Sequence, residues 1–153
     1  MPGALDKQIF ASFYFEVNVD TFAQNDYSFM EVSGINMERE VVEIGSGGLP
    51  YAYRVPGKTK YGELTLKRGV VMANSPLTKW CMKTIQSNLD AAIEPKGITV
   101  KLMNAKGKPA MSWNFKNAWP KKWEVSNLSS MASGESALLI ETLTFVYQSF
   151  KKV

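Results

Sequence analysis

The feature that most restricts the fold of this chain is a recurring alternation of apolar and polar residues with a period of two. The first such stretch carries an apolar side chain at every second position, at Phe13, Phe15, Val17 and Val19. The same alternation returns in Ile98–Leu102 and again in Met111–Phe115. Because successive side chains of a strand point to opposite faces, each stretch is predicted to be a β-strand with one apolar face.

Further strands are predicted where β-branched and aromatic residues gather between turn residues, in Phe29–Glu43, Gly62–Gly69, Lys121–Val125 and Ala137–Gln148. Gly34 interrupts the first of these segments, which indicates a bulge or a close approach of two backbones. Asn104–Pro109 has the composition of a hairpin turn. Trp119-Pro120 is expected to break the chain, because proline cannot donate a hydrogen bond to a strand ladder.

One segment, Ser75–Leu89, has the spacing of an amphipathic helix. Ser75 is a good N-cap and Pro76 suits the first helical turn. The positions that follow helical spacing are Leu77, Trp80, Cys81, Thr84, Ile85 and Asn88. Together, these elements predict a mainly β chain, a small antiparallel β-barrel or sandwich with one packed α-helix. A single domain is expected over residues 1–153, with residues 1–10 as a flexible N-terminal extension.

The last predicted strand has apolar residues on both of its faces. Leu139, Leu143, Phe145 and Tyr147 lie on one face, and Ile140 and Val146 lie on the other. An isolated antiparallel sheet usually keeps one polar face, so the second apolar face is expected to be covered. Either the helix or another subunit could cover it, and the period of the sequence does not decide between the two.

The residues that most often carry catalysis are missing or isolated. The chain has no histidine, the commonest general base and metal ligand, and Cys81 is interpreted as a small buried hydrophobic residue. Glu38 and Glu40 share one strand face, whereas catalytic carboxylates usually come from separate elements. Gly57-Lys58-Thr59 lacks the earlier glycine of a phosphate-binding loop, where Ala52 stands instead. We therefore predict no enzymatic activity and no catalytic, cofactor-binding or metal-binding residues.

The segment Leu49–Lys60 is predicted to be a loop or an edge arm, because it contains proline within an otherwise extended stretch. Tyr51, Tyr53 and Tyr61 are the aromatic residues expected to be exposed, and Arg54 lies beside the first two. Tyrosine and arginine are enriched at protein interfaces. The arm is therefore a candidate site for contact with another protein chain.

Charge and hydropathy leave one alternative of a different class open. The net charge is +4 and aromatic residues make up 12% of the chain, which would also suit a small nucleic-acid-binding β-barrel. Such a barrel would bind DNA with a steep salt dependence and little self-association. No apolar run approaches the roughly 20 residues of a membrane span, so no membrane insertion of the monomer is expected. An enzyme using Glu38 and Glu40 is the third and least favoured class.

An ordered series of segments resembles the contractile-tail tube protein family. The series is Phe13–Val19, Phe29–Ile35, Glu43 with Gly47-Gly48, Val55-Pro56-Gly57, Leu64–Gly69, a helix with Trp80, Ile98–Leu102, Trp113–Pro120 and Glu141–Thr144. This family includes the tail tube proteins of phages and the inner tube proteins of extracellular contractile injection systems, and it is similar to the tube protein of type VI secretion. The resemblance covers about Ile9 to Val153.

The resemblance implies a structural subunit that forms homo-hexameric rings, which stack into a hollow tube for protein or DNA cargo. The expected partners are further copies of the chain, a sheath protein, and baseplate and tail-terminator or cap proteins. The subunit would be made in the bacterial cytoplasm and assembled into a phage tail or phage-tail-like particle. A tube-initiator ring at the baseplate is the alternative within the family.

The resemblance also implies roles for particular segments. The arm Gly47–Lys60 would contact the next ring or a neighbour, through Gly47, Gly48, Tyr51, Tyr53, Arg54, Pro56, Gly57 and Lys58. The long strands Phe29–Val42 and Ala137–Gln148 would contribute to the lumen wall. The face of each strand that points inward is left open, because a shift of one residue inverts every assignment.

Overall fold

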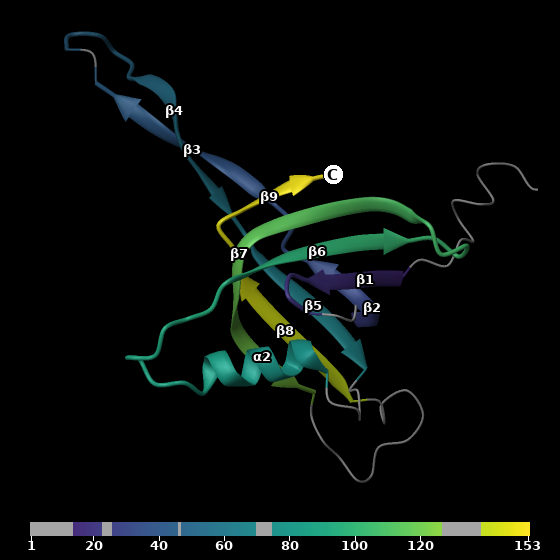
Figure 1. The fold of residues 1–153 in the computed structure, drawn as a ribbon. Coiled ribbons are helices and arrows are strands. Elements are labelled where there is room, and N and C mark those ends of the chain that lie inside the picture. The colour runs from purple at the N-terminus through teal and green to yellow at the C-terminus, as the bar shows by residue number, and fades with distance from the viewer. Residues whose placement is uncertain (1–13, 23–25, 46, 70–74, 127–138) are drawn as a thin grey trace, which may run out of the picture.

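The fold was determined as a computed structural model, which describes residues 14–22, 26–45, 47–69, 75–126 and 139–153 (Figure 1). The elements, in chain order, are β1 (Tyr14–Val19), β2 (Asp26–Ser33), β3 (Met37–Ile44), β4 (Tyr53–Tyr61), β5 (Glu63–Gly69), α2 (Pro76–Ile85), β6 (Lys96–Met103), β7 (Pro109–Val125), β8 (Ile140–Val146) and β9 (Ser149–Lys152). The predicted residues Ala137 and Leu138 of the last strand lie outside the described residues.

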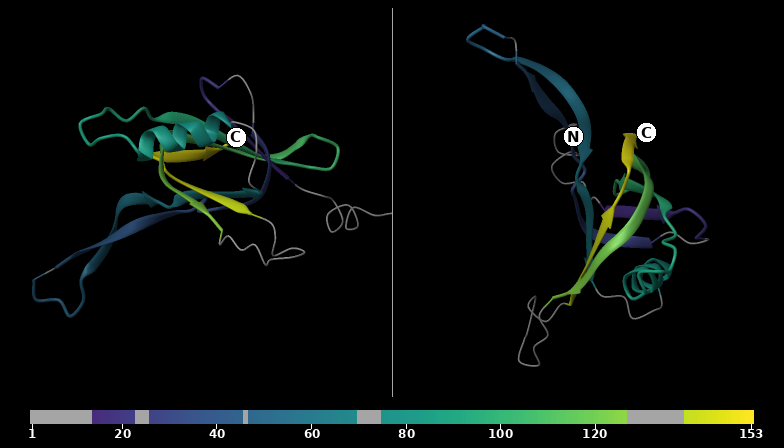
Figure 2. Two further views of the ribbon diagram at one scale, coloured as in Figure 1. Left: turned by 90° about the horizontal axis from the view of Figure 1, so that it is seen from below. Right: turned by 90° about the vertical axis from the view of Figure 1, so that its left-hand side faces the viewer.

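The strands form an antiparallel barrel that closes on itself. The order in the main sheet is β6-β1-β2-β5-β8-β7-β9, and β7 also pairs with β6, which completes the ring. Strands β3 and β4 form a separate two-stranded sheet that projects from the barrel (Figures 1 and 2). The predicted fold class, a small antiparallel barrel with one packed helix, is confirmed.

The expected chain break at Trp119-Pro120 is wrong, because strand β7 runs through both residues without interruption. Its first part pairs with β6 as far as Ala118, and its second part pairs with β8 from Trp119 onward. Asn117 has a φ of 51°, and the register shifts between Pro120 and Lys122. The strand therefore bends and changes partners at this point, where the missing N–H of proline is tolerated.

Helix α2 begins as predicted and ends earlier than predicted. The Ser75 side chain accepts a hydrogen bond from the Thr78 backbone N–H, and Pro76 is the first helical residue. The helix ends at Ile85, so Leu89 lies outside it and is fully exposed. The buried residues of its apolar stripe are Leu77, Trp80 and Cys81, which join the barrel core.

The helix packs on only one face of β8. Trp80 stacks on Phe145 with 5.6 Å between ring centroids, and Phe145 is buried together with Leu143 and Tyr147. Ile140, on the opposite face, lines a surface pocket with residues of β2 and β5. The helix therefore does not cover Ile140. The predicted buried face is confirmed for Leu143, Phe145 and Tyr147, whereas Leu139 is exposed.

A buried ion pair fastens the start of α2 to the barrel. Arg68 Nε on β5 donates to Glu141 Oε2 on β8 at 3.0 Å, and both side chains are almost completely buried. Arg68 Nη2 also donates to Ser75 Oγ at 2.9 Å and to Thr78 Oγ1 at 3.1 Å. Glu141 Oε1 accepts from Thr78 Oγ1 at 2.8 Å and from Trp123 Nε1 at 2.7 Å. The network joins two strands, the long bent strand and the helix N-terminus.

Candidate inter-subunit arm

The β3–β4 hairpin is an arm that extends the barrel wall into solvent. β3 follows β2, β4 leads into β5, and β2 pairs with β5 in the barrel, so the arm continues that strand pair outward (Figure 2). Its pairing runs from Met37 opposite Tyr61 at the base to Ile44 opposite Tyr53 near the tip. The β3–β4 hairpin therefore holds a long two-stranded surface away from the core of its own chain.

The base of the arm is held by close backbone contacts. Gly34 has a φ of +87°, and a Cβ atom there would lie 1.6 Å from the carbonyl oxygen of Glu63. The Tyr147 hydroxyl donates to the Gly34 carbonyl oxygen at 3.0 Å. The Gly62 N–H donates to the Asn36 carbonyl oxygen at 3.2 Å. The predicted interruption at Gly34 is thus a close backbone approach that sets the angle at which the arm leaves the barrel.

Aromatic side chains support the same junction from inside the barrel. Tyr61, at the end of β4, was expected to be exposed but is half-buried, because its ring packs against the core. It contacts Tyr147 at 5.9 Å and Phe150 at 5.6 Å between ring centroids. Phe115 contacts Tyr147 at 4.9 Å. Burial raises the pKa of the Tyr147 hydroxyl, so this group stays a neutral donor to the arm base.

Removing the Tyr147 hydroxyl is expected to weaken this junction. Tyr147→Phe should lower the free energy of unfolding by about 1 kcal/mol, because the Gly34 carbonyl loses its donor while the ring packing remains. Urea unfolding followed by circular dichroism measures the change. The matched control is Tyr53→Phe, whose ring is exposed on the arm. Equal stability of the two variants would contradict a clamping role for Tyr147.

The surface of the arm is unusually apolar for an exposed hairpin. Every residue of β3 is exposed. Ile44 lies opposite Tyr53 and Val42 lies two residues away, so all three share one face, with exposed fractions of 51%, 53% and 42%. On the other face, exposed Val41 lies opposite Pro56. A two-stranded hairpin is marginally stable alone in water, so its exposed apolar surface makes the arm a candidate for contact with another chain.

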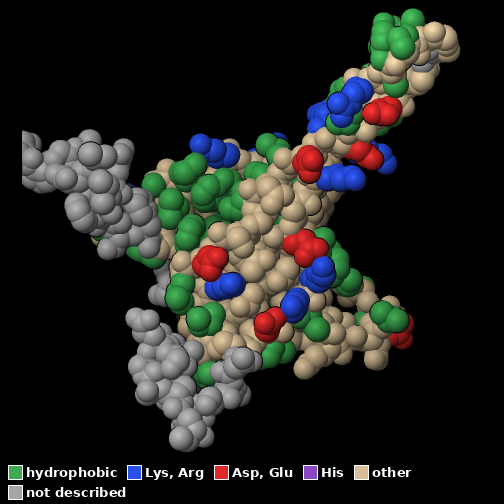
Figure 3. Space-filling model, turned by 180° about the vertical axis from the view of Figure 1, so that it is seen from behind, with side chains coloured by type: hydrophobic (Ala, Val, Ile, Leu, Met, Phe, Trp, Pro, Cys, Tyr) green, Lys and Arg blue, Asp and Glu red, His purple; other side chains and the backbone are tan. Residues whose placement is uncertain are grey.

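Two ion pairs join charged residues across the two strands of the arm. Glu43 and Arg54 lie 3.9 Å apart, and Glu40 and Lys60 also lie 3.9 Å apart. Glu38 lies directly opposite Lys60 in the ladder. Exposed pairs of this kind contribute little stability. Glu38 and Glu40 therefore belong to a charged strand surface, the interpretation that the sequence favoured (Figure 3).

The structure gathers all the predicted arm residues on this one hairpin, although not as a loop. Gly47 and Gly48 lie between the two strands, and Tyr51 precedes β4. The remaining predicted residues, Tyr53, Arg54, Pro56, Gly57 and Lys58, are part of strand β4. Leu49–Lys60 is therefore largely a paired strand, and Pro56 is accommodated where the register shifts between Arg39 and Val41.

Sequence reasoning missed the other half of the arm. The exposed apolar residues Met37, Val41, Val42 and Ile44 of β3 were expected within a long strand and not as part of the arm surface. The signal available was the absence of strict alternation in Val41-Val42 and Ile44, which places apolar residues on both faces. Both strands together form the candidate interface.

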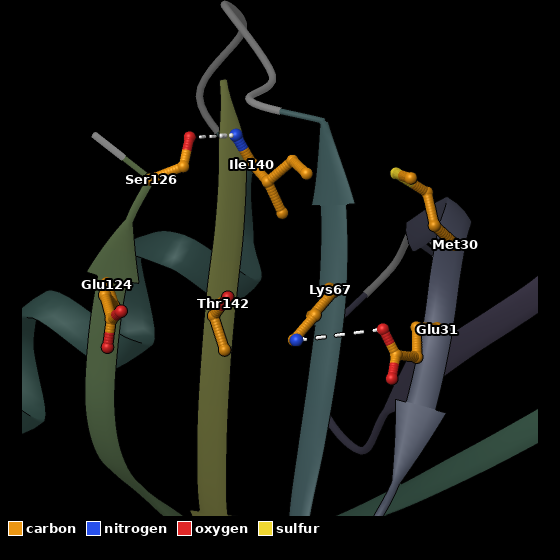
Figure 4. Close-up of a pocket in the computed structure, with 7 residues that line it drawn as sticks. All are labelled: Met30, Glu31, Lys67, Glu124, Ser126, Ile140 and Thr142. Atoms are coloured by element: carbon orange, nitrogen blue, oxygen red, sulfur yellow. Dashed lines mark hydrogen bonds and ion pairs between the residues drawn. The ribbon is translucent and has the colours of Figure 1, made fainter. Parts of the chain in front are cut away.

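A second exposed surface lies on the outer face of β2, β5, β8 and β7. Lys67 pairs with Glu31 at 3.7 Å beside Thr142 and Ile140, in a shallow pocket (Figure 4). Two more exposed ion pairs on this face are Lys121–Glu63 at 2.8 Å and Lys122–Glu124 at 2.9 Å. This surface, the polar sheet face, therefore carries acidic and basic groups in balance.

Within the described ranges, no helix is long and apolar enough to cross a membrane. Among the same residues, no group of three or more histidine, cysteine, aspartate or glutamate side chains is placed to hold a metal ion.

Solved structures with a similar fold come from contractile injection systems. A chain of the anti-feeding prophage baseplate has a TM-score of 0.73 and 22% identity, over 100% of this chain and 96% of its own. A chain of the sheath-tube complex of PVC, an extracellular contractile injection system, has a TM-score of 0.73 and 24% identity, over 91% of this chain and 87% of its own. Hcp1 from Flavobacterium johnsoniae has a TM-score of 0.59 and 16% identity, over 91% and 94%.

No curated protein sequence matches the chain. A family model does match it, over residues 11–151, and that family is described as the T4-like virus tail tube protein gp19. The match spans the helix, the arm and the barrel strands, except for Lys152 at the end of β9. The similar structures agree with it in fold. The chain belongs to the T4-like virus tail tube protein gp19 family.

Proposed function

We propose that this chain is the main inner-tube subunit of a contractile injection particle or phage tail, forming hexameric rings that stack around a cargo-conducting lumen. The observation that carries the proposal is the arm. It exposes apolar side chains on both faces at the end of a rigidly held base, and a second copy of the chain is the partner that the family supports. Arm contacts between copies would join neighbouring rings.

The polar sheet face is the surface best suited to the lumen. It is broad, lies on the continuous strands β2, β5, β8 and β7, and balances its lysines with glutamates. A wall with paired charges offers no strong net attraction to a passing polyanion or protein. The arm extends from two of these strands, so ring stacking through the arm would keep the polar sheet faces of successive rings in line.

Purified protein should assemble into rings or stacked tubes. The test is negative-stain electron microscopy together with size-exclusion chromatography over a series of protein concentrations. Rings with a central hole that stack into tubes are the expected result. Rings that never stack would favour the tube-initiator role at a baseplate. A protein that stays monomeric at every concentration would contradict the proposal.

A substitution on the arm should prevent rings from stacking into tubes without preventing the rings from forming. Ile44→Glu places a charge on the exposed apolar face of the arm and is expected to abolish tubes while leaving the fold intact, because Ile44 is already half in solvent. The matched control is Thr59→Glu, an exposed residue of the same hairpin on its opposite face. Tubes of normal length from Ile44→Glu would show that this face is not an interface.

A further inference from the structure

A second apolar surface of the chain lies beside the C-terminal end of α2. It is a groove lined by Ile85, Leu89, Ile93, Trp119 and Lys121, among others. Ile85 and Ile93 are 41% and 50% exposed, and Leu89 is fully exposed. Exposed aliphatic side chains that gather around one groove indicate a surface that another molecule covers. We call this surface the helix-end groove.

The walls of the helix-end groove are held in place. Trp80 Nε1 on the buried side of α2 donates to the Glu94 carbonyl oxygen at 3.2 Å, which fixes the segment after the helix. The Ala91 N–H donates to the Asn88 carbonyl oxygen at 3.0 Å within that segment. The opposite wall belongs to the bent strand β7, paired with β8 at Trp119. A preformed groove can bind a partner without the cost of ordering it first.

The groove and the arm lie at opposite ends of the molecule. The view of Figure 1 and the turned view on the right of Figure 2 both place the arm at one end and α2 at the other. Two complementary patches at opposite ends of one chain form a heterologous contact, which repeats from copy to copy without closing. This arrangement is the one that stacked rings require.

The chemistry of the two surfaces also matches. The arm offers Val42, Ile44 and Tyr53 on one face, and the groove offers aliphatic side chains of similar exposure. The groove carries Lys121, and the last turn of α2 beside it carries Lys83. The β3 strand of the arm carries charges of both signs, and its Glu40 and Glu43 already pair with Lys60 and Arg54 of the same hairpin. The match between the two surfaces therefore rests on their apolar side chains, and an apolar centre is typical of specific interfaces.

We infer that the helix-end groove is the docking site for the arm of a second copy, in the adjacent ring. The face with Val42, Ile44 and Tyr53 packs against Leu89 and Ile93 of the next subunit. This inference rests on the proposed function, because it assigns the contact that joins one ring to the next. It leaves the contacts within each ring to other surfaces of the barrel.

Cross-linking between two single-cysteine variants tests the contact directly. Ile44→Cys and Leu89→Cys are purified separately, mixed under assembly conditions and treated with a short bis-maleimide. The native Cys81 is completely buried, so it should not react in the folded protein. A covalent dimer is expected in the mixture of the two variants. The matched control replaces Leu89→Cys with Ala105→Cys, an exposed residue in the β6–β7 turn.

A substitution in the groove gives a second, independent result. Leu89→Asp should shift tubes to single rings, while Ala105→Asp should leave tube length unchanged. Loss of the rings themselves would overturn the inference, because the groove would then act within a ring. Rings that still stack, or a mixture that gives no specific dimer, would also overturn it. Absence of rings from the unmodified protein would instead overturn the proposed function, and the inference would fall with it.

Discussion

Glu141→Gln should lower the free energy of unfolding by about 3–5 kcal/mol, among the largest effects expected for one residue of this chain. The substitution keeps the size of the side chain and removes its charge, so the buried Arg68 guanidinium loses the carboxylate that lies 3.0 Å from its Nε. Arg68 is only 2% exposed and cannot turn out to water. The hydrogen bonds of Arg68 to Ser75 and Thr78 are to neutral hydroxyl groups and do not replace the charge of Glu141.

Urea unfolding at protein concentrations below ring formation measures this loss without the added stability of assembly. The matched control is Glu124→Gln, which removes the carboxylate of an exposed pair with Lys122 on the neighbouring strand β7. The control should change stability very little, because exposed ion pairs contribute little. Similar losses from both variants would show that the buried network is not what holds α2 to the barrel.

The pH dependence of unfolding provides a second measurement on the same variant. Burial alone would raise the pKa of Glu141, but hydrogen bonds from Trp123, Thr78 and Arg68 and the charge of Arg68 outweigh it and lower the pKa. A carboxyl group with a lowered pKa stabilises the fold above its unfolded value, which is about 4.3. That stabilisation is lost as the pH falls through the folded pKa. Glu141→Gln should therefore flatten the acid side of the stability profile, and an unchanged slope would contradict the assignment.

The strands and the helix could be predicted from the sequence because their patterns are local. Period-two alternation in Phe15–Val19 and Ile98–Leu102 depends only on which side chains face the core, and both segments are strands of the barrel. The cap at Ser75 and Pro76 is also a local signal, and it marks the start of α2 correctly. The predicted end of the helix at Leu89 was wrong, because Leu89 continues the helical spacing beyond Ile85 but lines the groove instead.

The course of β7 and the form of the arm could not be predicted, because both depend on distant partners. Pro120 reads as a chain break unless β8 is known to take over pairing where β6 ends. Pro56 reads as a loop residue unless β3 is known to pair with it across a register shift. Of the candidate site, sequence reasoning identified the tyrosine and glycine half. It missed Val42 and Ile44 because a strand has the same local pattern whether its own core or another subunit covers it.

The second large loss of stability is expected at Gly34, where adding a single carbon atom would disturb a close contact between two backbone segments. Gly34→Ala should lower the free energy of unfolding by about 3 kcal/mol or more, from backbone strain combined with overpacking. The φ of +87° is unfavourable for alanine, and the new Cβ would lie 1.6 Å from the Glu63 carbonyl oxygen and 2.6 Å from its carbon. Both atoms belong to the backbone at the start of β5, so no side-chain rotation can relieve the clash.

Gly34→Ala should also impair tube assembly, because the Gly34 carbonyl oxygen accepts the hydrogen bond from Tyr147 that anchors the arm. Displacing this backbone turns the arm relative to the barrel, so any Gly34→Ala protein that folds should form fewer and shorter tubes. Urea unfolding and electron microscopy of the same samples measure the two effects. The matched control is Gly47→Ala near the arm tip, where an added Cβ meets nothing within 4 Å. If Gly34→Ala proved as stable as Gly47→Ala and stacked normally, the close approach at Gly34 would not set the direction of the arm.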